Sequence, residues 1–153
     1  MEELFGEETR EKEITMNRIF DKISDQKFDE NKEDIDVKET AGSSIETTKT
    51  IAVQRLIEDE YLADQTFKAL KIEDSYKDST HRYIVIETEQ DKNTEEKSFE
   101  VLSVIRTIDK GITNYQEGES KNFRIVGKDA ENLSNIAKST RFKLSLITEQ
   151  LER

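Results

Sequence analysis

The end of the chain, from Lys121 to Arg153, reads KNFRIVGKDAENLSNIAKSTRFKLSLITEQLER. Phe123 to Val126 is a short apolar run with β-branched residues, which is typical of a strand. Gly127 then marks a tight turn, and Asp129 is a suitable residue to cap the start of a helix. Beyond it, apolar residues recur at helical spacing: Leu133, Ile136, Ala137, Leu144, Ile147 and Leu151. The stretch therefore predicts a strand, a turn and a helix that is the main packing partner of a sheet.

Two further strands are expected upstream. The segment from Arg82 to Glu89 contains Tyr83-Ile84-Val85-Ile86, a β-branched and aromatic run closed off by polar residues. The segment from Ser98 to Ile108 fits a strand, but it also fits a helix that ends at Lys110-Gly111. We favour a strand because valine and isoleucine dominate it and a polar turn region precedes it. The residues from Ile112 to Ser120 are expected to form a loop.

Two helices are expected before these strands. The apolar residues from Thr50 to Ile72 follow one helical stripe. A narrower stripe lies within the segment from Glu7 to Lys27 and consists of Met16, Ile19, Phe20 and Ile23. Between the two, Phe28 to Lys49 is rich in acidic and small residues, a composition typical of linkers and disordered segments.

The predicted fold class is α+β, with a small antiparallel sheet of about three strands packed against two helices. The N-terminal amphipathic helix is expected to lie on an acidic flexible arm. This division predicts an arm over residues 1–42 and a compact α+β domain over residues 43–153. The boundary is placed near Gly42 because most of the excess negative charge lies in the first third of the chain.

Composition excludes several chemistries. Charged residues make up 39% of the chain, hydrophobic residues 33%, and the net charge is −11. This acidity opposes non-specific binding to phosphate backbones, which relies on lysine and arginine. There is no cysteine, which excludes disulfides and thiolate chemistry, and the one histidine, His81, cannot form a zinc site of several histidines. No cofactor, no metal ligands and no catalytic residues are therefore predicted.

The sequence also predicts where the protein acts. It contains no apolar run of about 18 residues, so no membrane span is expected. The N-terminus begins Met1-Glu2-Glu3, whereas a secretory signal begins with basic residues followed by an apolar stretch. We expect a cytoplasmic or intracellular protein that does not associate with a membrane.

The acidic residues around one predicted hairpin make a metal-dependent nuclease a less favoured alternative. Glu87, Glu89, Glu95 and Lys97 surround a predicted hairpin, and such carboxylates and lysines can hold magnesium and assist an attacking water. The pattern is weak because Glu95 and Lys97 belong to a polar turn, while Glu87 and Glu89 alternate as solvent-facing strand residues do. His81 has no carboxylate cluster or nucleophile near it in sequence, which favours a surface role.

The predicted function is a non-enzymatic protein–protein interaction, of a regulatory or accessory kind that small acidic proteins of phages and mobile elements often have. The expected contact to the partner protein is the N-terminal arm, through Leu4, Phe5, Met16, Ile19, Phe20 and Ile23. An oligomer is compatible with this prediction.

The alternative involves nucleic acid. Lys138, Arg141 and Lys143 cluster within about two helical turns of a locally basic segment and could contact nucleic acid or an acidic partner. An acidic chain could also act as a nucleic-acid mimic and occupy a partner's binding site for a phosphate backbone.

Overall fold

The computed structural model describes residues 14–26, 35, 37–38, 44–72, 80–90 and 96–152. Residues 14–24 form the N-terminal helix in this part of the chain. The elements that follow are α2 (Ile45–Ile57), α3 (Glu60–Leu70), β1 (His81–Gln90), β2 (Lys97–Asp109), β3 (Ile112–Glu117), β4 (Lys121–Ile125) and α4 (Lys128–Leu151). The predicted α+β class and antiparallel sheet are confirmed, with four strands instead of about three. Among the described residues, no helix combines the length and the apolar character needed to cross a bilayer.

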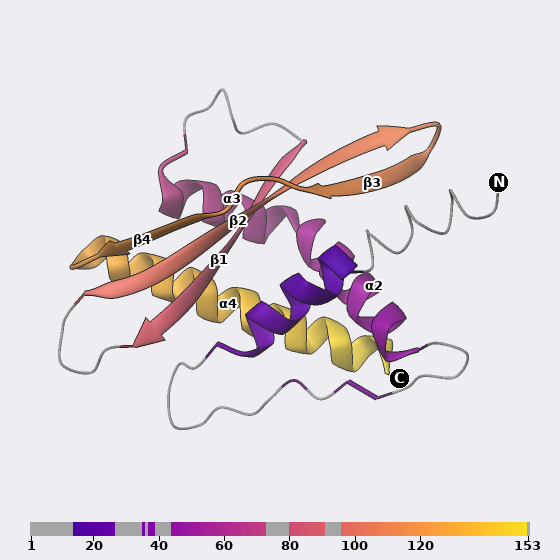
Figure 1. The fold of residues 1–153 in the computed structure, drawn as a ribbon, viewed down its shortest axis with the longest axis horizontal. Helices are drawn as coiled ribbons and strands as arrows, with labels where there is room; N and C mark the ends of the chain where they lie inside the picture. Colours follow the sequence, from indigo (N-terminus) through magenta and orange to yellow (C-terminus); the bar gives the residue numbers. More distant parts are fainter. Residues whose placement is uncertain are drawn as a thin grey trace.

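Strand β2 is the centre of the sheet (Figure 1). It pairs with β1 along one side and with both β3 and β4 along the other, always antiparallel. Val104 pairs with Glu117 and Val101 pairs with Lys121, so two residues of β2 face three residues between β3 and β4. The strands β3 and β4 are therefore successive parts of one long hairpin arm, interrupted by a bulge of one extra residue.

The loop predicted between Ile112 and Ser120 is wrong, because most of this segment is β3. Lys110 and Gly111 form the two-residue turn that joins β2 to β3, with φ angles of 51° and 78°. Two central residues with positive φ match the twist of a hairpin. The glycine that resembled a helix end is therefore a hairpin signal, and Ser98 to Ile108 is strand as favoured.

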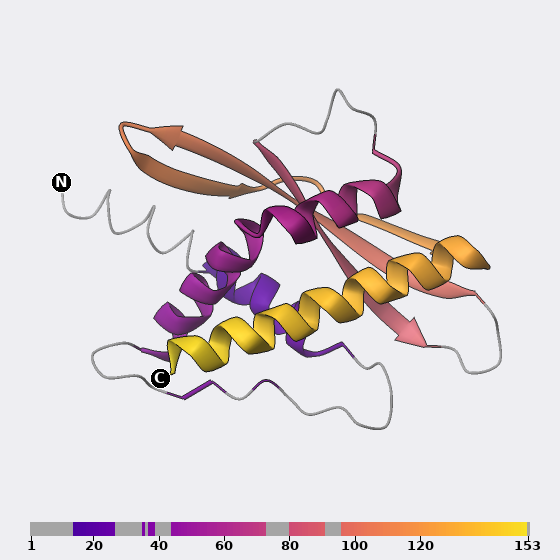
Figure 2. The same ribbon diagram turned by 180° about the vertical axis from the view of Figure 1, so that it is seen from behind.

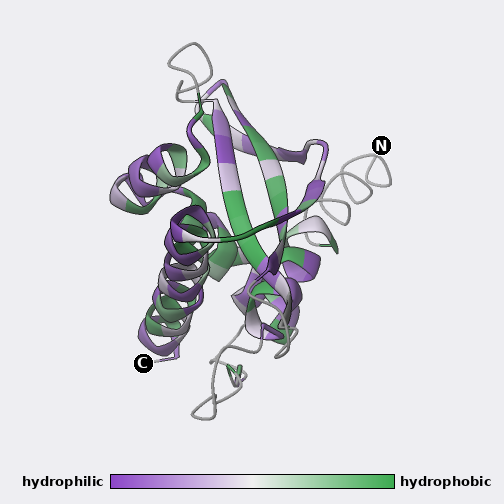
Figure 3. Ribbon diagram, turned by 90° about the vertical axis from the view of Figure 1, so that its left-hand side faces the viewer, coloured by the Kyte–Doolittle hydropathy of each residue, from purple (hydrophilic) through white to green (hydrophobic). Residues whose placement is uncertain are grey.

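The two faces of the sheet bury different sets of residues. One face carries Ile84, Ile86, Leu102 and Val104 and packs against the N-terminal helix, α2 and the C-terminal half of α4. The other face carries Val85 and Phe99 and packs against Ala130, Leu133 and Ala137 in the N-terminal half of α4. The helix α4 thus serves both cores, running from beside β4 to beside α2 (Figures 1 and 2). Figure 3 shows the apolar positions gathered along the middle of the strands and on the helices next to them.

The N-terminal helix belongs to the core, which corrects the prediction of a separate arm for this part of the chain. Its stripe is buried, with relative exposures of 0% for Met16, Ile19 and Ile23 and 1% for Phe20. Lys22 Nζ lies 3.1 Å from both carboxylate oxygens of Glu100 on β2. The four apolar residues predicted to contact a partner are therefore covered by the chain itself.

A residue just after this helix also hydrogen-bonds to a backbone amide at the edge of the sheet. The side-chain oxygen of Gln26 accepts a hydrogen bond of 2.8 Å from the Glu87 amide of β1, where a bulge shifts the pairing with β2. Farther along, Ile35 and Val37 pack against the same core, and the Lys38 amide donates to the Glu152 carboxylate at 2.7 Å. A boundary near Gly42 therefore does not separate these residues from the compact domain. Leu4 and Phe5 lie outside the described residues.

The helix predicted from Thr50 to Ile72 is two helices, since α2 ends at Ile57 and α3 begins at Glu60. Asp59 caps α3 by accepting a hydrogen bond of 2.9 Å from the Leu62 amide. Three consecutive acidic residues at this corner pair with bases from three other elements: Glu58 with Arg106, Asp59 with Lys143 at 3.1 Å and Glu60 with Arg82 at 2.7 Å. These ion pairs fix the bend that Figure 2 shows between α2 and α3.

Candidate functional site

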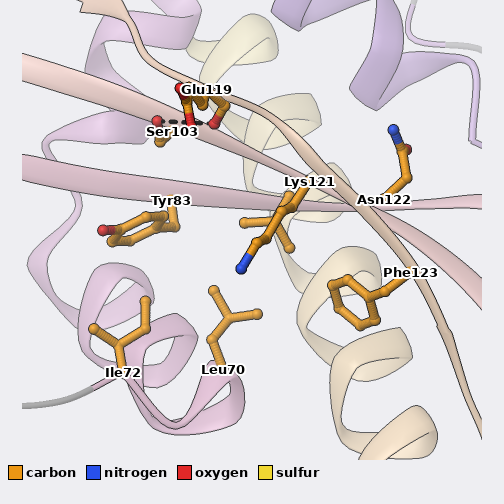
Figure 4. A pocket seen from close by; sticks show the side chains of 9 residues that line it. Leu70, Ile72, Tyr83, Ser103, Glu119, Lys121, Asn122 and Phe123 are labelled. Atoms are coloured by element: carbon orange, nitrogen blue, oxygen red, sulfur yellow. Dashed lines mark hydrogen bonds between the residues drawn. The ribbon is translucent and has the colours of Figure 1, made fainter.

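An open groove lies on the sheet face that carries Val85 and Phe99. Its volume is about 670 Å³, and its lining residues come from α3 and the segment after it, from three strands and from the bulge: Leu70, Ile72, Tyr83, Val101, Ser103, Glu119, Lys121, Asn122 and Phe123. Five of these nine side chains are apolar or aromatic. Figure 4 shows Leu70 and Ile72 on one wall, Tyr83 on the sheet and Phe123 at the opposite end. The volume falls within the range of ligand pockets, and the lining combines apolar residues with a few polar groups.

Ring contacts and a helix end hold the groove walls in place. Phe67 meets the Tyr83 ring edge-on at 5.7 Å, and Phe99 lies 5.9 Å from the Phe123 ring. The helix α3 ends at Leu70 and is followed by Lys71, whose φ of 56° is left-handed. This turns the chain so that Leu70 and Ile72 both line the groove. Lys71 Nζ also lies 3.2 Å from Asp129 Oδ2, which links the end of α3 to the start of α4.

The bulge between β3 and β4 forms the polar rim. The Gly118 amide donates to the Ser103 carbonyl at 2.8 Å, and the Ser103 hydroxyl donates to the Glu119 carbonyl at 3.1 Å. A Cβ atom at Gly118 would lie 2.2 Å from Ser103 Oγ, so only glycine allows this close approach. Bulges often re-aim side chains beside binding sites. Here the bulge places Lys121 so that its amine extends into the groove toward Leu70 (Figure 4).

Three exposed bases without an ion-pair partner among the described residues lie on and next to β4. Nine lysines and arginines of the described chain form salt bridges: Arg18, Lys22, Lys49, Lys68, Lys71, Arg82, Lys97, Arg106 and Lys143. Lys121, Arg124 and Lys128 are exposed and have no side-chain ion pair or hydrogen bond to any described residue. The three bases thus place local positive charge along β4 in a molecule whose net charge is −11, while the groove lining itself contains one acid, Glu119, and one base, Lys121.

A smaller hollow adjoins the same strand. Its volume is about 250 Å³, and Asn122, Phe123 and Arg124 of β4 line it together with Thr88, Ser98 and Phe99. Two hollows therefore lie along β4, and Asn122 and Phe123 line both of them.

The basic residues predicted to form one surface on α4, which are Lys138, Arg141 and Lys143, do not all lie on the same side of the helix. Arg141 Nε donates to the Ser24 carbonyl at 3.4 Å, whereas Lys143 Nζ lies 3.1 Å from Asp59 Oδ2. The two residues are about 200° apart around the helix, so they contact elements on opposite sides of it. Lys138 is exposed and takes part in an interaction of its own. The structure therefore does not bring the three residues together as one basic face.

The residues weighed for a nuclease site are also dispersed. Glu87 was expected on the solvent face, but it is 4% exposed, and its carboxylate oxygens have no hydrogen-bond partner among the described residues. Lys97 Nζ is 3.9 Å from Glu87 Oε1. His81 lies six residues away along β1, which corresponds to about 20 Å. The side chain of Glu89 and the whole of Glu95 fall outside the part that the structure describes.

No group of three or more metal-ligating side chains occurs within the described ranges. Comparisons with other proteins give no further guidance, because no protein-family model, no curated protein and no solved structure matches the chain.

Sequence reasoning did not find the groove because its lining residues come from four segments that are distant in sequence. The available signal was local. In β4 apolar Phe123 and Ile125 alternate with basic and polar residues, which indicates a strand with one apolar and one polar side.

Proposed function

We propose that the protein is a non-enzymatic binding module that holds an apolar segment of a partner protein in the groove beside β4. The observation that supports this proposal is the groove itself, about 670 Å³ in volume and lined mainly by Leu70, Ile72, Tyr83, Val101 and Phe123. Apolar and aromatic surface of this kind supplies affinity when a partner covers it. The proposal keeps the interaction role predicted from the sequence and moves the contact from the N-terminal helix, which is buried, to this groove.

The chemistry of the lining favours binding over catalysis. The titratable side chains of the lining are those of Glu119, Lys121 and Tyr83. The serine of the lining, Ser103, donates its hydroxyl to the Glu119 carbonyl. A hydrolytic or group-transfer site needs a nucleophile held by a base, or a carboxylate pair in reach of a reacting atom. The lining residues provide neither arrangement.

The test is a selection of binding peptides from a displayed library of random peptides on the full-length protein. Enriched peptides are then titrated against Leu70→Gln and Val101→Thr, which make the groove more polar with little change of volume. Leu146→Gln is the matched control, since Leu146 is a partly exposed leucine on α4 that does not line the groove.

We expect each groove variant to raise the peptide Kd by about tenfold, the effect of losing roughly 1.4 kcal/mol of apolar contact. The control is expected to leave the Kd within about twofold. The proposal is wrong if no peptide is enriched, or if enriched peptides bind the groove variants and the control equally well.

A further inference from the structure

Resting on the proposed function, we infer that the bound partner segment is acidic and extended, and that it adds as a strand to the outer edge of β4. One of its side chains would then enter the groove over Phe123. This inference names the conformation and charge of the ligand, which the groove alone does not define.

The edge of β4 is open to such pairing. In the described sheet β4 pairs with β2 alone, and Figures 1 and 2 show it at the rim of the sheet. An unpaired strand edge presents amide and carbonyl groups that an extended peptide can satisfy. The strand contains no proline, and its five residues from Lys121 to Ile125 offer an edge of about 17 Å.

The two hollows beside β4 offer space to the side chains of an added strand. Successive side chains of an added strand point to opposite faces of the sheet. The larger groove contains Lys121, Asn122 and Phe123 of β4, while the smaller hollow contains Asn122, Phe123 and Arg124, so the two hollows overlap at the middle of the strand. An added strand would therefore run past both hollows, with the larger groove beside the Lys121 end of β4 and the smaller hollow beside the Arg124 end.

Charge complementarity defines the ligand as acidic. Lys121 and Arg124 belong to β4, and Lys128 begins α4 three residues after it. None of the three has a partner within the described residues, whereas most bases elsewhere are paired. Aspartate and glutamate on the incoming strand would satisfy them and speed the encounter. A second copy of the chain fits less well, because pairing of two β4 strands would bring both sets of cations together.

The first experiment uses peptides enriched by selection on the protein and measures their affinity by fluorescence anisotropy. Each acidic residue of the peptide is replaced with its amide, Asn or Gln. On the protein, the triple variant Lys121→Gln, Arg124→Gln, Lys128→Gln is compared with the triple variant Lys38→Gln, Arg55→Gln, Lys110→Gln. Both triple variants change the net charge equally, and the control residues are exposed and lie outside both hollows.

We expect the β4 triple variant and the amide peptides each to raise Kd at least about tenfold at low salt, with a smaller effect at high salt. The control triple variant should change Kd by about threefold or less. Equal effects of the two triple variants, or tight binding of the neutral peptides, would overturn the acidic assignment. If the neutral peptides bind tightly and their binding is still weakened by Leu70→Gln and Val101→Thr, the proposed function stands and only this inference fails.

The second experiment tests the strand geometry. Peptides N-methylated at single positions lose one backbone donor each, and pairing along one edge predicts that alternate positions weaken binding strongly while the others do not. Uniform tolerance of N-methylation would contradict strand addition. A labelled oligothymidine serves as the nucleic-acid probe, and tighter binding of it than of the peptides, lost in the β4 triple variant, would assign these cations to nucleic acid instead.

Discussion

Arg82 shows at the residue scale how the acidic corner between α2 and α3 is held. Although it is charged, its relative exposure is only 4%. Its side chain donates to the Ile57 carbonyl at 3.3 Å and pairs with Glu60 at 2.7 Å. The arginine therefore donates to the last carbonyl of α2 and pairs with the carboxylate of the first residue of α3 at the same time.

Replacement of Arg82 with methionine should lower the free energy of unfolding by about 1–3 kcal/mol, because the Ile57 carbonyl loses its buried donor. Glu60→Gln is the matched variant, and it should have a smaller effect because the Glu60 side chain is 73% exposed. Urea unfolding monitored by circular dichroism measures both. Equal stability of Arg82→Met and wild type would show that this contact does not hold the corner.

Tyr115 gives a prediction about pH. Burial and a hydrogen bond of 2.7 Å to Glu58 raise the pKa of Tyr115 above its ordinary value of 10.0. Above pH 10.0 the unfolded chain releases this proton while the folded chain retains it, so stability falls as the pH rises. Unfolding free energies across this range should decline more steeply for wild type than for Tyr115→Phe, and parallel declines would contradict the assignment.

Substitution of Gly118 tests the geometry of the bulge that forms the polar rim of the groove. In Gly118→Ala the new methyl group forces Ser103 to rotate and to lose its hydrogen bond to the Glu119 carbonyl. We expect a loss of about 1 kcal/mol of stability. In a Ser103→Ala background the clash disappears, so the same substitution should then have a much smaller effect. A double-mutant cycle without coupling between the two positions would refute this geometry.

At the scale of elements, the N-terminal helix changes most between expectation and structure. Its stripe of apolar residues was correctly identified, but an amphipathic pattern does not say whether a partner or the chain's own sheet covers it. The sheet covers it, and Lys22 and Gln26 anchor it to β2 and β1.

Phe20→Ala should therefore lower the free energy of unfolding by about 3–5 kcal/mol, the range for a large buried side chain. Ile14→Ala is the control on the same helix, since Ile14 is 65% exposed, and it should change stability by about 0.5 kcal/mol or less. Deletion of residues 1–42 should abolish cooperative thermal unfolding. If the truncated chain unfolds as sharply as the full chain, residues 1–42 are a separate arm, as the sequence predicted.

The strands were predictable in proportion to their burial. The β-branched runs of β1 and β2 and the periodicity of α4 reflect residues that the core requires, so their patterns are strong. The strand β3 carries the weak pattern ITNYQE, and its first residue, Ile112, is 64% exposed. It pairs because the Lys110-Gly111 turn brings it back onto β2.

The break between α2 and α3 could not be located from the apolar stripe, which continues through it. The bend depends on Glu58 and Asp59, and these meet their bases only after the sheet and α4 are in place. The groove beside β4 was unpredictable for the same reason, because α3, β1, β2, β4 and the segments next to them each contribute residues to it.

At the scale of the whole molecule, the distribution of charge distinguishes β4. The chain has a net charge of −11, and most of its described bases pair with acids that fix helices and strands to one another. The cations on and next to β4 are unpaired within the described chain, and two of them line hollows, Lys121 the larger groove and Arg124 the smaller hollow. The fold therefore presents one cationic, partly apolar strand edge on an otherwise acidic protein.

The most direct test of this account is the mapping of a selected peptide on the isotope-labelled full-length protein by amide chemical shifts in NMR spectra. The account predicts that the largest changes fall on β4, on Val101 of β2, on Tyr83 of β1 and on Leu70 at the end of α3. Changes centred instead on the exposed hairpin tip at Lys110-Gly111, or around the exposed Phe142 on α4, would contradict it.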